Sequence, residues 1–278
     1  MSAFHYCFNT STIRGQKLSL VEEIDIVAQA GYTAIEPWIN EIEAYVKQGG
    51  SLPDLKKRIS DLGLTVASAI GFAEWIVDDD QKRAKGLEHA RRDMDLVQQI
   101  GGTRIAAPAA GATEVTNIDY LKVAERYRAL LALGDHFDVV PMVEVWGFSK
   151  TLTRLGQAMM VAIEANHPNA CILADVYHLY KGGSDFTGLS LLSATSMHVC
   201  HLNDYPAKPP RDVIADKDRV YPGDGVAPLV DILQTLHNIG FDGYLSIELF
   251  NPTYWSQDPH EVARTALTKL KALTAQVK

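Results

Sequence analysis

Short apolar runs alternate with longer amphipathic segments along the whole chain. Eight of these runs have the length of a buried strand, and eight helical segments separate or follow them. The expected strands cover 4–8, 34–36, 64–70, 104–107, 139–144, 170–175, 197–201 and 244–248. Repeated β-then-α order implies parallel strands. Eight such units in 278 residues predict an α/β fold, a (β/α)8 TIM barrel that forms a single domain over residues 1–278.

Helix signals lie between these strands. Ser19 and Glu22 have the spacing of a capping box, and Gly31 is expected to end the helix that they begin. The other expected helices cover 52–62, 80–100, 118–136, 152–165, 189–192, 227–239 and 259–277. A long connection, 199–225, is rich in Pro and Asp. We expect it at the functional face of the barrel, as a lid or a substrate-binding loop.

Four consecutive strands end on side chains that can bind a metal. These side chains, each at the C-terminal end of an apolar run, are Glu144, Asp175, His201 and Glu248. In a parallel barrel these ends share one face and belong to neighbouring strands, so the four should converge. Three carboxylates buried together repel one another unless a cation lies between them. The pattern therefore predicts a divalent-metal site.

The donor set restricts the metal without choosing it. Three carboxylate oxygens and one imidazole nitrogen suit Mn²⁺, Mg²⁺, Co²⁺ or Zn²⁺, and the absence of thiolates argues against a structural zinc site. We expect one ion, with Mn²⁺ as the first choice. In the alternative interpretation, each carboxylate only caps the following helix or pairs with a lysine. That interpretation is hard to sustain for four such residues on consecutive strands.

Composition excludes several classes of function. Lys and Arg total 26 and Asp and Glu total 34, which gives a net charge of −8 and opposes binding to nucleic-acid phosphates. The segment from Met1 to Tyr6 lacks the pattern of a signal peptide, and no apolar stretch reaches the length of a membrane span. The three cysteines lie in expected strands without CxxC spacing. We therefore expect buried free thiols in a cytoplasmic protein that acts on a small molecule.

The second half of the chain resembles a known family. Its motifs are Val-Glu at 143–144, Asp-Val-Tyr-His at 175–178, His-Leu-Asn-Asp at 201–204, Arg-Val-Tyr-Pro-Gly-Asp-Gly at 219–225 and Ser-Ile-Glu at 246–248. These motifs are similar to those of the sugar phosphate isomerase/epimerase family in the xylose isomerase-like TIM barrel superfamily. The resemblance covers the whole chain and is strongest from Val139 to Trp255. Family members are often dimers or tetramers, so a homo-oligomer is an option.

The resemblance implies roles for individual residues. Glu144, Asp175, His201 and Glu248 would hold one divalent metal, and the two glutamates would also act as the acid/base pair on opposite faces of the substrate. His178 and Arg219 would bind substrate oxygens; an arginine can hold such a group by two hydrogen bonds. The role of Arg211 is left open.

Further positions are expected at the barrel mouth from their place at or near strand ends. Glu36 follows the same rule as the four ligand candidates, and either substrate contact or support of another side chain suits it. Trp146 is expected to contact substrate, since aromatic rings commonly form the apolar walls of pockets. Other candidates for the wall are His5, Trp38, Glu74 and Trp255.

The resulting hypothesis is a divalent-metal-dependent isomerase or epimerase of a ketose, keto-polyol or related small hydroxy-carbonyl compound. Its mechanism would pass through a metal-stabilised cis-enediolate. A metal-dependent dehydratase of an inosose or a dehydroshikimate-like acid is the first alternative. An abasic-site endonuclease is disfavoured because the expected strands at 34–36, 64–70 and 104–107 end without histidine. A barrel that binds a ligand without catalysis is the remaining alternative.

Overall fold

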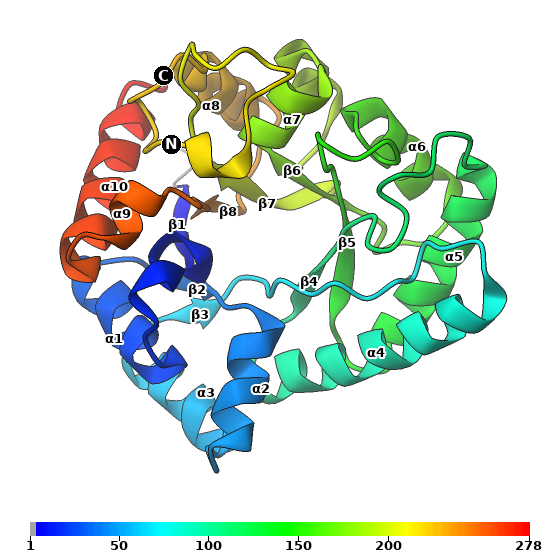
Figure 1. Cartoon of the computed structure of the whole chain (residues 1–278), viewed down its shortest axis with the longest axis horizontal. Helices are drawn as coiled ribbons and strands as arrows, with labels where there is room; N and C mark the ends of the chain where they lie inside the picture. The colour runs from blue at the N-terminus through cyan, green and yellow to red at the C-terminus, as the bar shows by residue number, and fades with distance from the viewer. Residues whose placement is uncertain (1–3) are drawn as a thin grey trace.

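Eight parallel strands surrounded by helices form the (β/α)8 barrel that the sequence predicts (Figure 1). The computed structural model describes residues 4–278; residues 1–3, part of the segment inspected for a signal peptide, lie outside it. The strands are β1 His5–Asn9, β2 Ala34–Glu36, β3 Thr65–Val66, β4 Arg104–Ala107, β5 Val140–Glu144, β6 Ile172–Asp175, β7 Met197–Leu202 and β8 Tyr244–Ile247.

Strand pairing runs β3-β2-β1-β8-β7-β6-β5-β4, every pair being parallel. The ring closes between the segment after β3 and β4. There, Ala69 N–H donates to the Arg104 carbonyl at 3.1 Å, and Ala106 N–H donates to the Ala69 carbonyl at 2.9 Å. The expected strand 64–70 was thus too long. Only its first part has regular strand geometry, although its last part still bonds to both neighbours.

Helices surround the strands as a ring, and most of the expected ones are present (Figure 1). The Ser19–Glu22 capping box forms, and Gly31 ends the first helix in the left-handed conformation. The α-helices are α1 Leu20–Ala30, α2 Ile39–Lys47, α3 Leu52–Asp61, α4 Asp80–Gln99, α5 Tyr120–Gly134, α6 Leu155–Glu164, α7 Val176–Gly182, α8 Leu229–Asn238, α9 Pro252–Trp255 and α10 Pro259–Thr274. Among residues 4–278, no helix has the apolar stretch that a membrane span requires.

Three α-helices and two 3-10 helices were not expected. They are α2, α7 and α9, with η1 Thr10–Gln16 and η3 Asp216–Asp218. The helix expected at 189–192 was wrong in kind and extent, because the chain instead forms the 3-10 helix η2 Phe186–Leu191. The main helix between β6 and β7 is α7, which begins directly after Asp175. The chain between β6 and β7 therefore turns at the strand end itself.

The alternation of side chains along each strand places the site inside the barrel. A small apolar cluster consists of Ile70, Ala106, Met142, Cys171, Leu173 and Val199. Glu144, Asp175 and His201 each lie two residues beyond a member of this cluster, so they share its face of the sheet. The larger core lies between the strands and the helices. Cys7, Cys171 and Cys200 are buried free thiols, as expected.

The long connection after β7 is held by one carboxylate. Asp204 accepts hydrogen bonds from the backbone N–H groups of Gly223 and Gly225, both at 3.0 Å, and of Ala227 at 2.9 Å. Asp204 also pairs with Val220 through two backbone hydrogen bonds of 3.1 and 2.9 Å. These bonds place the segment that contains Arg219 beside the barrel mouth.

Candidate metal centre and cavity

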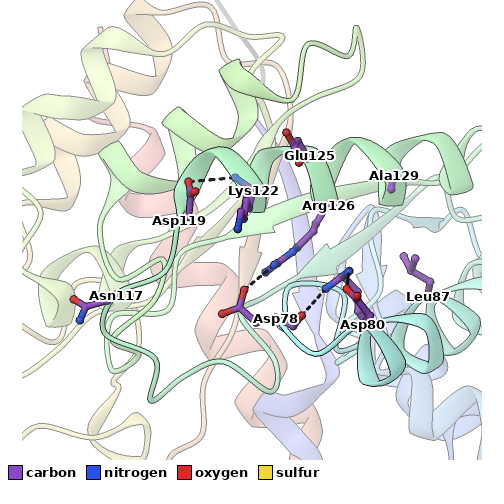
Figure 2. Close-up of a pocket in the computed structure, with 10 residues that line it drawn as sticks. Asp78, Asp80, Leu87, Asn117, Asp119, Lys122, Glu125, Arg126 and Ala129 are labelled. Carbon is purple, nitrogen blue, oxygen red and sulfur yellow. Dashed lines mark hydrogen bonds and ion pairs between the residues drawn. The ribbon is translucent and has the colours of Figure 1, made fainter.

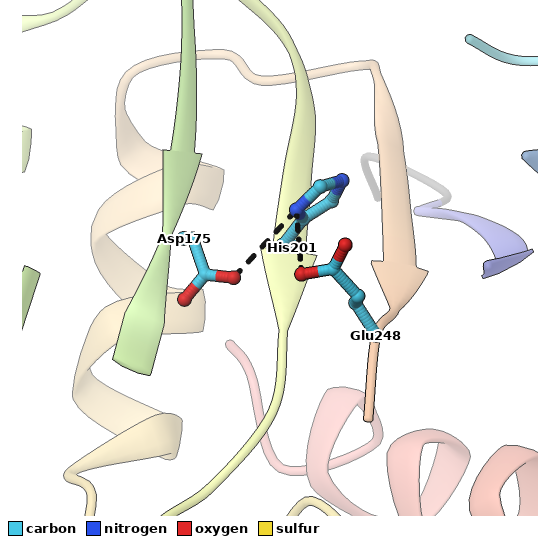
Figure 3. A group of neighbouring side chains, drawn as sticks. All are labelled: Asp175, His201 and Glu248. Carbon is cyan, nitrogen blue, oxygen red and sulfur yellow. Dashed lines mark ion pairs between the residues drawn. The ribbon is translucent and has the colours of Figure 1, made fainter. Parts of the chain in front are cut away.

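Three of the four expected ligands converge at the ends of β6, β7 and β8. One ligand atom from each of Asp175, His201 and Glu248 lies within 4.8 Å of the others, and all three side chains are buried (Figure 3). The register explains this meeting. Asp175 pairs with His201, and His201 pairs with Ser246, two residues before Glu248. The group is able to hold a metal ion.

The imidazole of His201 faces the two carboxylates with one nitrogen. Its Nδ1 lies 3.3 Å from Glu248 Oε2 and 3.6 Å from Asp175 Oδ2, but makes no hydrogen bond to either. Its Nε2 lies 3.0 Å from Glu36 Oε2. A hydrogen on Nε2 would donate to Glu36 and leave the Nδ1 lone pair between Asp175 and Glu248. This tautomer is the one that a metal ligand requires.

Glu36 lies behind His201 and is completely buried. Its Oε2 also accepts hydrogen bonds from Asn9 Nδ2 at 2.9 Å and from Ser246 Oγ at 2.7 Å. It is not among the residues that line the cavity at the barrel mouth. Of the two roles considered for Glu36, this position favours support of His201 over substrate contact.

Glu144, the fourth expected ligand, lies outside the group of three converging atoms. It is buried, and its Oε2 has no hydrogen-bond partner among the described residues. Burial raises the pKa of Glu144 to about 8; Glu248 and Asp175 also raise it, while His201 opposes them. A buried carboxylate beside two others, with one free oxygen, has the environment that a cation would relieve. The donor set therefore fits a divalent metal.

Arg219 joins the carboxylates from the long connection. Its Nη1 donates to Asp175 Oδ2 at 3.0 Å and to Glu248 Oε2 at 2.8 Å. Its Nη2 donates to His178 Nε2 at 3.1 Å and to Asp216, and its Nε donates to Asp216 at 3.1 Å. All five N–H groups of the guanidinium thus have acceptors. Contact between Arg219 and a substrate would require one of these partners to be exchanged.

The charge of Arg219 also acts on Asp175. Burial favours the neutral carboxyl group, but Arg219, with His178 and His201, holds the pKa of Asp175 well below its usual range. Asp175 also accepts hydrogen bonds from the backbone N–H of His178 at 2.8 Å and from Asn203 Nδ2 at 3.1 Å. Asp175 is therefore a charged, fixed oxygen donor.

His178 presents one nitrogen without a protein partner. Its Nε2 accepts from Arg219, and its Nδ1 is buried with no hydrogen-bond partner among residues 4–278. Burial lowers the pKa of His178, which favours the neutral ring, although Asp175 opposes this effect. A neutral imidazole that accepts at Nε2 has its hydrogen on Nδ1. That N–H is available to donate to an oxygen atom of a ligand.

A cavity of about 380 Å³ opens beside these groups. Glu144, Glu248, His178 and Arg219 line it, and Trp146, the predicted substrate contact, does so too. The rest of the lining is mainly apolar and includes Trp38, Ile70, Phe72, Phe148, Phe250, Pro252 and Trp255. Its size and its few polar groups are typical of small-molecule sites.

Two residues expected in the cavity wall lie elsewhere. His5 begins β1 and lines a different hollow with Arg104 and His198, at the N-terminal ends of the strands. Glu74 is exposed and does not line the cavity. These predictions were wrong because His5 lies at the opposite end of its strand, and because the segment after β3 turns away before Glu74. Arg211 is exposed too, and its guanidinium lies over the Tyr180 ring.

A larger hollow of about 690 Å³ lies between the N-terminal parts of α4 and α5 (Figure 2). Both arginines of its lining pair with aspartates: Arg126 with Asp78 at 2.6 Å, and Arg83 with Asp80. None of the predicted ligand, catalytic or substrate-binding residues lines it. The smaller cavity at the strand ends is therefore the candidate active site.

Sequence reasoning missed two amides at the site. Asn9 ends β1 and bonds to both Glu36 and Glu248, while Asn203 bonds to Asp175 and accepts from the backbone N–H of Tyr177 at 2.8 Å. Both asparagines are completely buried. The available signal was position, because each lies at or just after the C-terminal end of a strand. A neutral amide at such a position does not by itself indicate a metal site, whereas a carboxylate does.

Comparison with known proteins agrees with this architecture. The model of the family described as Xylose isomerase-like TIM barrel matches residues 24–273. The chain belongs to this family. Relatives carry the names of isomerases, epimerases and dehydratases. The resemblance stated from the motifs is thereby confirmed.

Two relatives illustrate the range. An inosose isomerase from Halalkalibacterium halodurans is 29% identical over 94% of this chain and 93% of its own length. A 3-dehydroshikimate dehydratase from Pseudomonas aeruginosa is 26% identical over 84% of this chain but only 36% of its own length. The crystal structure of the IOLI protein with a bound zinc atom has a TM-score of 0.90 and 20% identity, and 99% of each chain is covered. At that identity the likeness shows the fold.

Proposed function

We propose that this protein is a divalent-metal-dependent isomerase or epimerase of a ketose, keto-polyol or related small hydroxy-carbonyl compound. The main support is that two carboxylates, Glu144 and Glu248, line one cavity beside a buried group of metal-capable atoms. Two carboxylates at one small cavity suit proton removal from a substrate carbon and proton return to it.

The residues that would hold the ion are Glu144, Asp175, His201 and Glu248. A bound divalent ion would polarise a substrate carbonyl and so acidify the neighbouring C–H group. We expect Mn²⁺ first, with Mg²⁺, Co²⁺ or Zn²⁺ as alternatives. The zinc atom bound in the IOLI structure supports metal binding in a similar fold without choosing the ion for this chain.

The two glutamates have different surroundings, which supports a division of work between them. Glu248 accepts hydrogen bonds from Asn9 and Arg219, whereas Glu144 has an oxygen without a partner. In the proposal, Glu248 transfers a proton from a fixed orientation on one side of the substrate. Glu144 exchanges a proton with the substrate carbon from the other side.

Neighbouring groups would hold the substrate oxygens. His178 can donate from Nδ1, and Arg219 can do so by releasing Asp216, whose side chain is partly exposed. Trp146 and the other rings of the cavity would pack against the C–H faces of a small sugar or cyclic polyol. The partner is thus a small molecule, and the net charge of −8 opposes nucleic acid.

Solvent-deuterium exchange into a panel of ketoses and keto-polyols tests the proposal. The single variants Glu144→Gln and Glu248→Gln should each lower the exchange rate by ~10²- to 10⁴-fold, the usual contribution of a positioned acid or base. Glu125→Gln is the matched control, because Glu125 lines the hollow between α4 and α5 instead. Near wild-type exchange in both site variants would make the proposed mechanism wrong. Tight metal binding without exchange on any substrate would favour a non-catalytic barrel.

A dehydratase is the second candidate, favoured by the relative named 3-dehydroshikimate dehydratase. The same pair of carboxylates could remove a C–H proton and protonate a leaving β-hydroxyl group. Its substrate would be an inosose or a dehydroshikimate-like acid. NMR of the products separates the two functions, because isomerisation conserves mass whereas dehydration gives an unsaturated or deoxy product that has lost water.

A further inference from the structure

Asn9 connects the two sides of the candidate metal centre through one amide group. Its Nδ2 donates to Glu36 Oε2 at 2.9 Å and to Glu248 Oε1 at 3.3 Å. Glu36 accepts from His201, and Glu248 faces it. Asn9 thus contacts Glu36, which supports the proposed ligand His201. It also contacts the proposed ligand Glu248 directly.

The orientation of the Asn9 amide is fixed by its other half. Its Oδ1 accepts from the backbone N–H of Ser11 at 3.0 Å and from Trp38 Nε1 at 2.9 Å. Both of these groups are donors only. A flipped amide would set its NH₂ group against two N–H donors and its oxygen against two carboxylates. Asn9 must therefore present its two N–H bonds to Glu36 and Glu248.

This orientation separates the two oxygens of Glu248. Oε1 is held by Asn9, while Oε2 accepts from Arg219 at 2.8 Å and lies 3.3 Å from His201 Nδ1. Oε2 is thus the oxygen that contacts Arg219 and faces His201. Without the Asn9 donor, the carboxylate could rotate, because no other protein hydrogen bond to Oε1 is found within residues 4–278.

We propose that Asn9 is a positioning residue that sets which oxygen of Glu248 faces the metal centre, and thereby sets the rate of proton transfer. The inference rests on the proposed function. A role through Glu36 alone would be shared by Ser246, whose Oγ donates to the same Oε2 atom of Glu36 at 2.7 Å but makes no hydrogen bond to the Glu248 side chain within the described residues. Ser246 is as completely buried as Asn9, so it provides a matched control.

The test compares Asn9→Ala and Asn9→Asp with Ser246→Ala. Mn²⁺ affinity is measured by calorimetry, and kcat and KM for solvent-deuterium exchange are measured at saturating Mn²⁺. All three variants lose a donor to Glu36, and each should weaken Mn²⁺ binding by roughly 10-fold. Only the Asn9 variants should also lower kcat, by about 10²-fold with little change in KM, as expected for a misplaced reacting group.

Asn9→Asp keeps the acceptor for Ser11 and Trp38 but sets a second oxygen against Glu36 and Glu248, so its melting temperature should fall below that of the wild type. Circular dichroism at the assay temperature guards against a simple loss of folding, because kcat is compared only among folded variants. Unfolding of both Asn9 variants at that temperature would overturn the inference in favour of a structural role. Equal kcat in the Asn9 and Ser246 variants would overturn it as well. If the wild type neither binds Mn²⁺ nor exchanges C–H protons, the proposed function fails, which is a distinct result.

Discussion

The two halves of the barrel contribute different groups to one centre. Strands β5 to β7 and the residue directly after β8 supply every proposed metal ligand: Glu144, Asp175, His201 and Glu248. Strands β1 and β2 supply Asn9 and Glu36, which contact those ligands from behind, and the chain just after β2 supplies Trp38 in the cavity wall. The half from β5 to β8 contributes the charged side chains, and the half with β1 and β2 fixes the orientation of these side chains.

This difference shows that a ligand set and its support are encoded differently. The ligands are metal-capable groups at the ends of apolar runs, so their positions can be read from the chain. The support depends on which strands become neighbours: Asn9 reaches Glu248 only because β1, the first strand of the chain, pairs with β8, the last. We therefore expect substitutions in the two halves to have effects of different size on Mn²⁺ affinity and different effects on kinetics.

The largest effect is expected in the ligand half. His201→Ala removes the only nitrogen from the converging group, so Mn²⁺ affinity should fall by more than the ~100-fold that loss of an outer partner can cause. Calorimetric titration measures this change. The control is His198→Ala, on the same strand but lining the hollow at the opposite end of the barrel. Unchanged Mn²⁺ affinity in His201→Ala would contradict the assignment of His201, and with it the ligand half, to metal binding.

An intermediate effect is expected from Glu36→Gln in the supporting half. The amide keeps the shape but removes the charge that His201 Nε2 faces, so Mn²⁺ affinity should fall by ~10- to 100-fold. KM at saturating metal should stay close to wild type if Glu36 acts only through His201. A raised KM with unchanged metal affinity would indicate direct substrate contact instead. Glu43→Gln, on the exposed face of α2, controls for the loss of a negative charge.

The smallest effect concerns a buried carboxylate that lacks such donors. Asp93 on α4 is 1% exposed, and neither of its oxygens has a hydrogen-bond partner among the described residues. Burial raises the pKa of Asp93 to about 6; Glu43 adds to this shift, and His89 opposes it. Asp175 is as deeply buried, but Arg219, with His178 and His201, keeps its pKa low. The difference between Asp93 and Asp175 shows how neighbouring donors change the pKa of a buried carboxyl group.

The raised pKa has a definite consequence for stability. Because the folded protein binds the Asp93 proton more tightly than the unfolded chain does, the contribution of Asp93 to stability falls as pH rises through about 6. Relative to wild type, Asp93→Asn should gain about 1 kcal/mol between pH 5 and pH 8. Urea unfolding at both pH values measures the change, with the exposed Asp95→Asn as control. A difference that does not vary with pH would show that Asp93 is not protonated in the folded state near pH 5.

Much of the fold was predictable because both of its signals are local. The Ser19–Glu22 box and the glycine stops set helix ends by short-range hydrogen bonds, and the apolar runs mark strands that are buried on both faces. The site followed from the same runs, since Asp175 and His201 end strands that are adjacent in sequence order and in the sheet.

The elements that were missed depend on tertiary contacts. The chain from Val176 to Gly182 is rich in aromatic residues, yet it forms α7 because Asp175 caps it and Asn203 accepts from Tyr177 N–H. At the end of the expected strand 64–70, Ile70 keeps only an isolated parallel bridge to Trp38, through hydrogen bonds with Pro37 and Ile39. The roles of Asn9 and Glu36 required knowledge of which strands meet. A short stretch of the sequence does not reveal any of these tertiary contacts.

Asp175 ends β6 and caps α7 at the same time. Its Oδ1 holds the backbone N–H of His178, while its Oδ2 lies 3.6 Å from His201 Nδ1, within the group of metal-capable atoms. A ligand that draws this carboxylate toward itself therefore acts on the first turn of a helix. The hydrogen-exchange rate of the His178 amide should then report occupancy of the centre from the backbone, without any substrate or turnover.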